Sequence, residues 1–271
     1  MNTLNDLVSI IIPNYNKALY LEQCIMSVVE QTYRPIEIIV VDDCSTDSSL
    51  DLLEKLKNTV PELIVIVQDK NAGVSTARNV GIKSANGLYV TMLDSDDYYY
   101  NPQKLSNEMS LIKNGYEFAY SKIVRVDNSG NVLPKQFLDN NLYLQGDVLA
   151  STMLGKNLNT IPRDYIISRK LALDCGGYPE GINLYEDLIF LIQLLSRVEV
   201  ACTYETGTAY RQDTNGLSKH PLVYKYRLRW RICWSQRRVF HGYEKITFSL
   251  RMLFTRITFE IKREVKRLIK K

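Results

Sequence analysis

A β-branched run ends in two carboxylates at residues 36–43, Ile-Glu-Ile-Ile-Val-Val-Asp-Asp. Its short length and its many β-branched side chains favour a buried strand over a helix. Residues 88–97, Leu-Tyr-Val-Thr-Met-Leu-Asp-Ser-Asp-Asp, repeat this arrangement of an apolar run with an acidic end. Apolar runs that are continuous rather than alternating are typical of a parallel sheet that is covered on both faces.

Strand and helix patterns alternate around these two runs. Further apolar strands are expected at 8–12 and 63–67, and helices at 18–31, 45–57 and 74–85. This alternation predicts an α/β fold with right-handed crossover connections. Beyond residue 102 the pattern weakens, and the elements expected there are a helix ending near 114, strands at 118–126 and 161–168, and a helix at 186–197.

The composition is that of an ordinary globular protein. The chain has 271 residues, of which 45% are hydrophobic and 24% charged, and this excludes a wholly disordered or collagen-like chain. The length suits one or two domains. Only two histidines are present, so a His-rich zinc site is excluded, and a Ser-His-Asp triad would have to use His220 or His241.

The five cysteines are scattered and form no C-x-x-C pair. Their spacing argues against a disulfide framework or a zinc ribbon and fits a reducing compartment. The N-terminus shows no signal-peptide pattern, and no apolar stretch reaches the length of about 18 residues that would span a bilayer. We therefore expect a cytoplasmic location.

The carboxyl ends of parallel strands meet at one edge of a sheet, where open α/β sheets bind their ligands. Asp42, Asp43 and the acidic residues of 94–97 are therefore expected on one rim. An acidic strand end can also simply cap the helix that follows, and for Asp42 and Asp43 alone this alternative stays open. Two acidic ends together favour a bound cation, and oxygen ligands without His or Cys select Mg²⁺ or Mn²⁺.

A hard cation at such a rim most often serves phosphate groups. The sequence contains neither G-x-x-x-x-G-K-[ST] nor G-x-G-x-x-G. It thus lacks the usual phosphate cradles of nucleoside triphosphatases and of dinucleotide-dependent dehydrogenases. Phosphates would instead be held by the metal, by cations such as Arg78 and by helix N-termini.

Five motifs, in this order and at this spacing, resemble those of family 2 glycosyltransferases of the GT-A fold. They are Val-Ser-Ile-Ile-Ile-Pro-Asn-Tyr-Asn at 8–16, Gln-Thr at 31–32, the acidic strand end at 37–47, Asn-Ala-Gly-Val-Ser-Thr-Ala-Arg-Asn at 71–79, and Asp-Ser-Asp-Asp at 94–97. The resemblance extends over residues 7–211. It implies a Rossmann-like, mostly parallel sheet flanked by helices. It also implies transfer of a sugar from a nucleotide diphosphate to an acceptor hydroxyl, with inversion at the anomeric centre.

The resemblance implies a donor site at the rim. Pro13, Tyr15 and Asn16 would line the nucleoside pocket. Asp43, with Asp42 beside it, would accept the N3–H of a uracil-like base.

The resemblance also implies roles for Arg78 and for a D-x-D element. Arg78 would contact the base or the phosphates. Asp94, Ser95 and Asp96 form the D-x-D element, in which one carboxylate would hold the ribose and the other Mn²⁺ or Mg²⁺. Asp97 would support them.

On the acceptor side, residues 176–187 resemble the Gly-Gly-Tyr…Glu-Asp stretch of the family. Asp187 would be the general base that takes the acceptor proton, and Glu186 its neighbour. Taken alone, this acidic pair could equally be one that the helix dipole favours at a helix N-terminus.

The third protein ligand of the metal departs from the family pattern. The family commonly carries Arg-x-His after the last strand, whereas residues 211–213 read Arg-Gln-Asp. Asp213 would then complete the metal site, or His220 would, and the sequence leaves both open.

The charge is distributed unevenly along the chain. Residues 225–271 contain 15 Lys and Arg against 3 Asp and Glu, whereas the rest of the chain contains 19 against 27. Residues 244–271 are expected to form one amphipathic helix. The apolar stripe of this helix consists of Ile246, Leu250, Leu253, Ile257, Ile261, Val265 and Leu268.

Such a basic helix has several interpretations. An apolar stripe with cationic flanks suits a helix that lies on an anionic membrane surface, which we favour. The stripe could instead pack on the protein's own body or on a second subunit, so a homo-oligomer stays open. No recognition motif accompanies the charge, and we expect no nucleic-acid partner. We divide the chain into a catalytic domain, 1–220, and a basic helical extension, 221–271.

We therefore predict a metal-dependent, inverting glycosyltransferase of the hexosyl- or N-acetylhexosaminyl class that uses a UDP-sugar. A glycan or lipid-linked saccharide would be the acceptor, in polysaccharide or cell-surface glycan synthesis at the cytoplasmic face of the membrane. Two alternatives stay open. One is a nucleotidyltransferase that acts on sugar phosphates at the same rim. The other is an inactive nucleotide-sugar-binding partner of another transferase.

Overall fold

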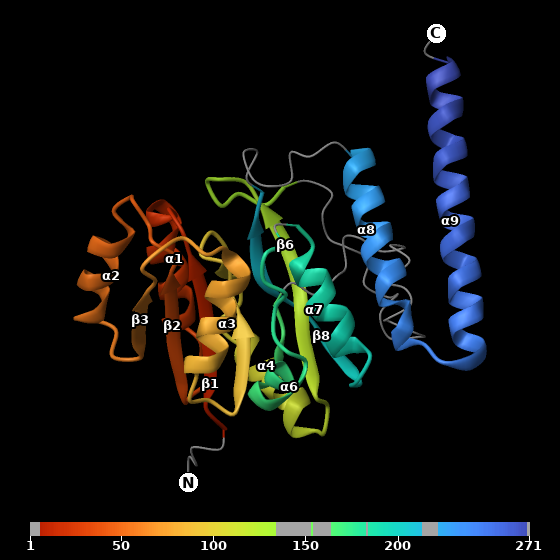
Figure 1. Cartoon of the computed structure of the whole chain (residues 1–271). Coiled ribbons are helices and arrows are strands. Elements are labelled where there is room, and N and C mark those ends of the chain that lie inside the picture. Colours follow the sequence, from red (N-terminus) through yellow and green to blue (C-terminus); the bar gives the residue numbers. More distant parts are fainter. Residues whose placement is uncertain (1–5, 134–152, 154–163, 183, 213–221, 270–271) are drawn as a thin grey trace.

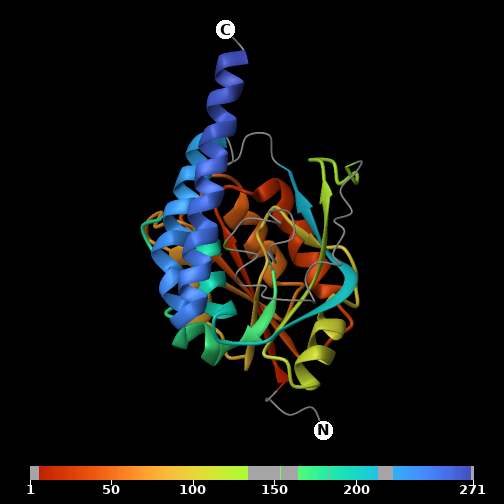
Figure 2. The ribbon, with the colours of Figure 1, turned by 90° about the vertical axis from the view of Figure 1, so that its right-hand side faces the viewer.

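The chain forms an α/β structure around one eight-stranded sheet (Figure 1). This computed structural model describes residues 6–133, 153, 164–182, 184–212 and 222–269. The strand order is β3-β2-β1-β4-β7-β6-β8-β5. Helices cover both faces of the sheet, and a pair of helices at the C-terminal end stands beside it (Figures 1 and 2). The α/β class predicted from the sequence is confirmed.

The first half of the sheet is parallel. Its strands are β1 (Val8–Asn14), β2 (Ile36–Asp42), β3 (Leu63–Val67) and β4 (Tyr89–Met92). The helices that connect them are α1 (Ala18–Val29), α2 (Ser49–Lys57) and α3 (Val74–Ser84). Asn14 pairs with Asp42 at the carboxyl ends of β1 and β2. The strand ends therefore meet at one rim, as the sequence predicts.

The second half of the sheet is mixed. It contains β5 (Tyr98–Tyr99), β6 (Phe118–Val126), β7 (Ile166–Ser168) and β8 (Val200–Arg211), with α4 (Lys104–Lys113), α6 (Arg169–Asp174) and α7 (Glu186–Leu195). β7 is antiparallel to both β4 and β6, whereas β8 runs parallel to β6. β5 is a two-residue strand antiparallel to β8, and it holds the chain directly after residues 94–97 against the sheet.

The core consists of two apolar layers, one on each face of the sheet. Ile10 and Ile38 pack with helix α1 on one face, and Ile11 and Ile39 pack with Phe190 of α7 on the other. All four isoleucines are fully buried. Burial of each contributes about 1.5–3 kcal/mol of transfer free energy. The continuous apolar runs in the sequence are explained by this burial of both faces.

The Gln-Thr motif at 31–32 connects the end of α1 to the turn before α4 by hydrogen bonds. The side-chain amide of Gln31 donates to the carbonyl oxygen of Asn101 (3.0 Å). Its side-chain oxygen accepts from the backbone N–H of Leu105 (3.0 Å). Gln31 thereby satisfies an N–H in the first turn of α4 that has no partner within the helix.

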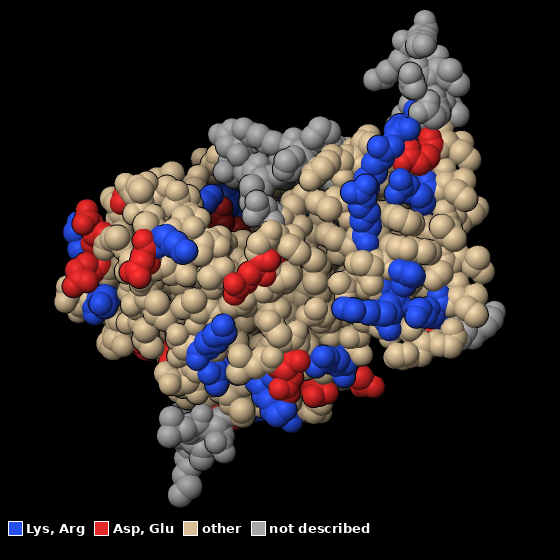
Figure 3. All heavy atoms as spheres, in the orientation of Figure 1, with Lys and Arg blue, Asp and Glu red and all other residues tan. Residues whose placement is uncertain are grey.

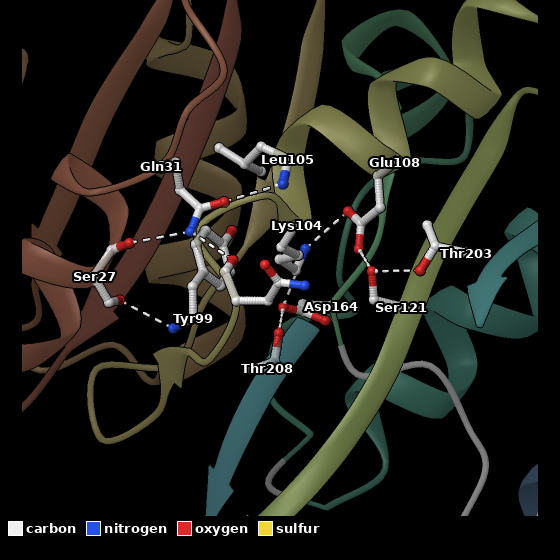
Figure 4. A network of polar contacts seen from close by, with 11 residues as sticks. Ser27, Gln31, Tyr99, Lys104, Leu105, Glu108, Ser121, Asp164, Thr203 and Thr208 are labelled. Atoms are coloured by element: carbon white, nitrogen blue, oxygen red, sulfur yellow. Dashed lines mark hydrogen bonds and ion pairs between the residues drawn. The ribbon is translucent and has the colours of Figure 1, made fainter. Parts of the chain in front are cut away.

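A cluster of charged side chains is buried between α4, β6 and β8 (Figure 4). The ammonium of Lys104 lies 2.8 Å from Glu108 and 3.4 Å from Asp164, and above the ring of Tyr99. Lys104 and Glu108 are fully buried. Ser121 donates to Glu108 (2.7 Å). Burial raises the pKa of Glu108 to about 7, against the attraction of Lys104. The second carboxylate, that of Asp164, shares the same ammonium and adds to this rise.

The C-terminal region is a helical hairpin of α8 (Leu222–Gln236), a 3-10 turn at Arg237–Val239 and α9 (Gly242–Ile269). Figures 1 and 2 show α8 beside α7, and α9 beside α8. One apolar cluster joins the three helices, with Leu188 and Ile192 from α7 and Phe248 and Met252 from α9. No helix in the described part of the chain is long and apolar enough to cross a membrane.

The buried Lys104 cluster predicts a pH-dependent stability. The pKa of Glu108 is raised from 4.5 to about 7 in the folded state, so the folded chain binds this proton more tightly than the unfolded chain does. The contribution of this group to the free energy of unfolding is fully present below pH 4.5 and is lost as the pH rises through 7. Relative to wild type, Glu108→Gln should therefore gain on the order of 1–3 kcal/mol in free energy of unfolding between pH 5 and pH 8. Urea unfolding at several pH values measures this difference.

The matched control is Glu54→Gln on the surface of α2, where the side chain is 77% exposed. Its difference from wild type should not change with pH. A Glu108→Gln difference that is equally flat would contradict the assignment.

Candidate active site

Asp42 shapes the loop after β2. Its carboxylate is fully buried and accepts from the side-chain amide of Asn14 (2.7 Å) and from the hydroxyl of Ser45 (2.7 Å). The backbone N–H of Ser45 donates to its other oxygen (2.8 Å). Asp42 therefore ties the ends of β1 and β2 together, and its oxygens point into the loop.

Asn16 closes the same loop from the β1 side. Its side-chain oxygen accepts from the backbone N–H groups of Thr46 (2.7 Å) and Asp47 (3.2 Å). Its own φ is +54°, in the left-handed region that Asn tolerates better than most residues. Helix α2 begins after this loop, at Ser49, with the backbone N–H of Ser49 bonded to Asp47. The helix therefore begins four residues later than the start at residue 45 that the sequence predicts.

Asp43 holds the loop that leads into α3. One carboxylate oxygen accepts from Gln68 (2.6 Å) and from the backbone N–H of Ala72 (2.8 Å), and the other accepts from the N–H of Gly73 (2.8 Å). Gly73 has a φ of +90°, a conformation that favours glycine, and it precedes the first residue of α3. The negative charge of Asp43 therefore lies at the positive end of this helix.

A cavity of about 390 Å³ opens beside Asp43. Of the residues assigned to the nucleoside pocket, Pro13, Tyr15 and Asp43 line it. Asn16, which follows β1, and Asp42, the last residue of β2, instead bond the loop that leads to α2. Its other lining residues are Asn14, Asn71, Ala72, Gly73, Val74, Ser75, Ala77, Gly181 and Ile182.

Two polar atoms in the cavity wall have no partner in the described structure. They are the side-chain oxygen of Asn14 and the hydroxyl of Ser75, and both residues are buried. A buried polar atom without a partner is costly unless a ligand or water satisfies it. The cavity can therefore form specific hydrogen bonds. Neither residue was singled out from the sequence, because both lie inside motifs with no charge to mark them.

The D-x-D element follows β4 and keeps two carboxylates accessible. Asp94 accepts from Arg78 (2.6 Å) and Asp96 from Lys17 (2.6 Å), and their side chains are 39% and 25% exposed. Asp97 is buried and accepts from the backbone N–H of Arg211 (2.8 Å). Asp42 and Asp43 are almost fully buried, so among the acidic strand ends predicted at the rim only Asp94 and Asp96 have substantially exposed side chains.

Arg78 lies between the D-x-D element and the start of α7. It comes from the middle of α3, is 7% exposed, and donates to Asp94 (2.6 Å) and to Glu186 (3.1 Å). Its guanidinium also lies over the ring of Tyr178. Burial disfavours the charge, but Asp94 and Glu186 outweigh burial and raise the pKa of Arg78.

The acidic pair lies at the N-terminus of α7. Tyr185, directly before the helix, has a φ of +68° and turns the chain so that Glu186 points to Arg78. Burial and the neighbouring charge of Asp187 raise the pKa of Glu186, which Arg78 opposes. Asp187 is exposed, and one of its oxygens accepts from the N–H of Leu188 (2.7 Å). The structure thus brings Arg78, Asp94 and Glu186 together, with Asp187 next to them in the chain.

The residues at this rim fit a hard cation in their chemistry. Asp94 and Asp96 offer accessible carboxylate oxygens, the ligand type that Mg²⁺ and Mn²⁺ prefer. Within the described residues, no three His, Cys, Asp or Glu side chains converge as a complete metal site. Asp213 and His220, the two candidates for a third ligand, lie outside the described residues.

The sequence between β1 and α6 matches the model of glycosyl transferase family 2, over residues 9–175. The chain belongs to glycosyl transferase family 2. The match contains Arg78, the D-x-D element and ten of the twelve residues that line the cavity. It ends before Glu186 and Asp187.

Two family 2 relatives come from Bacillus subtilis (strain 168). TuaG, a glycosyltransferase named for teichuronic acid biosynthesis, is 31% identical over 156 residues, which are 57% of this chain and 62% of TuaG. EpsJ, an uncharacterized glycosyltransferase, is 43% identical over 232 residues, with 79% of this chain and 64% of EpsJ covered. The chain therefore spans less than two thirds of the length of either relative.

The solved structures that are similar to this chain confirm the GT-A fold. S. aureus TarS 1–349 in complex with UDP-GlcNAc has a TM-score of 0.74 at 22% identity, with 94% of this chain and 73% of that chain covered. The mannosyltransferase PcManGT from Pyrobaculum calidifontis, in complex with GDP-Man and Mn²⁺, has a TM-score of 0.59 at 17% identity, with 85% and 63% covered.

Proposed function

We propose that this chain transfers a sugar from a UDP-sugar to a hydroxyl of a glycan or lipid-linked saccharide, with inversion at the anomeric centre. The observation that carries the proposal is the Arg78 guanidinium, which donates both to Asp94 of the D-x-D element and to Glu186 beside Asp187. It joins the donor-side and acceptor-side carboxylates next to a cavity of about 390 Å³. That volume lies within the usual range of small-molecule sites, about 300–1,000 Å³.

The nucleoside of the donor would occupy the cavity. Pro13 and Tyr15 offer apolar and aromatic surface, and Asp43 offers an acceptor at the cavity wall for a base N–H. The unpartnered oxygens of Asn14 and Ser75 add further hydrogen-bonding capacity. Asp42 and Asn16 would support this pocket by fixing the loop beside it. The UDP-GlcNAc complex of TarS, which has the same fold, supports a UDP-sugar as donor.

The leaving nucleoside diphosphate would be bound at the rim. Asp94 and Asp96, with Ser95 between them, would hold Mn²⁺ or Mg²⁺ together with Asp213 or His220, and one of the two Asp side chains would bind the ribose. When bound, the metal supplies positive charge that stabilises the diphosphate as it departs. Arg78 and Lys17 already pair with these carboxylates, so they keep the rim from excess negative charge.

Asp187 would take the proton of the acceptor hydroxyl as that oxygen attacks the anomeric carbon. Its carboxylate is exposed at the N-terminus of α7, where an incoming acceptor can reach it. Glu186, turned inward to Arg78, would orient the pair. The transferred sugar would be a hexose or an N-acetylhexosamine. The names of the relatives support a role in cell-surface polysaccharide synthesis.

We also propose that α9 holds the enzyme on an anionic membrane surface at the cytoplasmic face, with residues 1–220 as the catalytic domain and 221–271 as the membrane-binding extension. Phe248 and Met252 of α9 are buried against the hairpin. At 3.6 residues per turn, the exposed apolar residues lie on the opposite side of the helix. These residues are Ile246, Leu250, Leu253, Phe254, Ile257 and Ile261.

Positive charge accompanies this exposed stripe. Lys and Arg side chains gather over α8 and α9 on the face shown in Figure 3, while acidic residues are few there. Each basic residue near an anionic surface contributes about 1 kcal/mol. A stripe that faces solvent and has cationic flanks suits a helix lying in the membrane interface.

The first prediction concerns the metal. Asp96→Asn should abolish release of UDP from UDP-glucose and UDP-GlcNAc, and excess chelator should do the same to wild type. Both changes remove the cation that the departing diphosphate needs. Asp174→Asn, at the far end of α6, is the control and should keep full activity. Full wild-type activity in chelator would exclude metal dependence.

The second prediction concerns the base. Asp187→Asn should lower kcat by about 10²–10⁴, the usual contribution of a general base. Affinity for UDP, measured by calorimetry with Mn²⁺ present, should stay within a factor of two because Asp187 does not line the nucleoside cavity. If the affinity for UDP fell as far as kcat, Asp187 would belong to the donor site and would not be the base.

The third prediction concerns the membrane. Wild type should sediment with vesicles that contain phosphatidylglycerol, and salt should weaken but not abolish binding, because charge is screened over about 8 Å at physiological ionic strength whereas apolar burial is not. Leu250→Ser with Phe254→Ser should remove the part that resists salt. Leu19→Ser, at an exposed leucine on α1, is the control. The membrane proposal would be refuted if wild type did not sediment with the vesicles and instead formed a dimer through α9.

A further inference from the structure

A buried guanidinium lies directly against the D-x-D element. It belongs to Arg211, the last residue of β8, which is only 5% exposed. In the described structure its side chain donates four hydrogen bonds, and all four acceptors are uncharged oxygens. They are the backbone carbonyl oxygens of Asp96 (2.9 Å), Asp127 (3.1 Å) and Asn128 (2.7 Å) and the side-chain oxygen of Gln23 (2.8 Å). A guanidinium is costly to bury, and its rigid fork of donors suits it to hold several chain segments together.

Two contacts of Arg211 fix the backbone of the D-x-D element. Its Nε–H donates to the carbonyl oxygen of Asp96, and its backbone N–H donates to the carboxylate of Asp97 (2.8 Å). The turn itself is closed by the backbone N–H of Asp97, which donates to the carbonyl oxygen of Asp94 (2.9 Å). Arg211 therefore holds the backbone of this turn, while the side chains of Asp94 and Asp96 stay partly exposed.

The other contacts of Arg211 connect this turn to two further parts of the chain. The two remaining carbonyl oxygens belong to the turn after β6, and Gln23 lies on α1. The guanidinium also lies 4.5 Å from the ring centroid of Tyr20 on α1 and 5.7 Å from that of Tyr98 on β5. The D-x-D turn can therefore shift only if several of these contacts break together.

We infer that Arg211 is a positioning residue for the D-x-D element and that it sets the affinity of the rim for a divalent cation. The inference rests on the proposed function, in which Asp94 and Asp96 hold the metal. Mg²⁺ requires nearly ideal octahedral geometry, with ligand oxygens about 2.0–2.1 Å away, so a small shift of the turn would weaken binding. Asp213, one of the two candidates for a third ligand, follows Arg211 by two residues in the chain.

The experiment titrates full chains with Mn²⁺ and follows the electron paramagnetic resonance signal of the free ion, which falls as the ion binds. Arg211→Met should raise the dissociation constant of Mn²⁺ by about 10- to 100-fold, the usual effect of losing a group that orients metal ligands. Arg211→Lys should recover part of the affinity, because an ammonium can still donate to the carbonyl oxygen of Asp96 but lacks the fork that reaches all four acceptors.

Excess metal should overcome the defect. The Mn²⁺ concentration for half-maximal release of UDP from UDP-GlcNAc should rise in Arg211→Met by the same factor as the dissociation constant. At saturating Mn²⁺, kcat should return to within about a factor of two of wild type, because a weakened site still fills at high ligand concentration. Affinity for UDP in excess chelator should not change, because Arg211 does not line the nucleoside cavity.

A second variant keeps the test valid if Arg211→Met does not fold. Gln23 is exposed on α1, and Gln23→Met removes one of the four acceptors with little change in size. It should raise the dissociation constant of Mn²⁺ by about 2- to 10-fold, as for the loss of one hydrogen bond.

Arg169→Met is the matched control. The Arg169 guanidinium also donates to backbone carbonyl oxygens, those of Ile82 (2.9 Å) and Lys83 (2.8 Å) at the end of α3. Its backbone N–H bonds Leu88, which precedes β4, whereas the D-x-D element follows β4 at the opposite edge of the sheet. Arg169→Met should therefore keep the Mn²⁺ affinity of wild type even where its melting temperature falls.

An unchanged Mn²⁺ affinity in the folded Arg211 and Gln23 variants would overturn the inference, as would a wild type that binds no Mn²⁺. A purely structural role would also overturn it, and would show as a lower melting temperature and a loss of kcat that excess Mn²⁺ does not restore. A wild type that binds Mn²⁺ but releases no UDP from any nucleotide sugar would instead refute the proposed function.

Discussion

The site depends on one buried guanidinium. Arg78 enters from α3 and is kept charged by Asp94, from the loop after β4, and by Glu186, from the start of α7. An unpaired cation at that depth would be strongly destabilising. Each partner therefore fixes the others. Two segments that are about ninety residues apart in the chain are in this way held at a fixed distance from each other.

The parallel half of the fold could be predicted closely because its strands are buried on both faces. The strand expected in the run at 36–43 is β2, Ile36–Asp42, and the strand expected at 63–67 is β3. The mixed half of the sheet was harder to predict from the sequence. β5 is two residues long and is held by pairing with β8, and α6 is six residues long and is capped by Ser168. Such short elements form through tertiary contacts, which no local periodicity in the sequence records.

The placement of the motifs along the rim could be predicted from the sequence, but the contacts that each side chain makes could not. The motifs brought Pro13, Asp43, Arg78 and Asp94 to one rim, as expected. A sequence does not show which carboxylates will accept hydrogen bonds from the backbone. Asp42 does so because the N–H of Ser45 in the following loop donates to it.

The two tryptophans of the chain, Trp230 and Trp234, stack on each other within α8, with ring centroids 5.2 Å apart. Indole emission from this protein therefore originates wholly in the hairpin, whereas far-ultraviolet circular dichroism reports on the helices of the α/β body as well as on those of the hairpin. The two signals will coincide during denaturation only if the hairpin and the α/β body unfold as one cooperative unit. The placement of two side chains thus gives the C-terminal extension an intrinsic spectroscopic label, without any chemical modification.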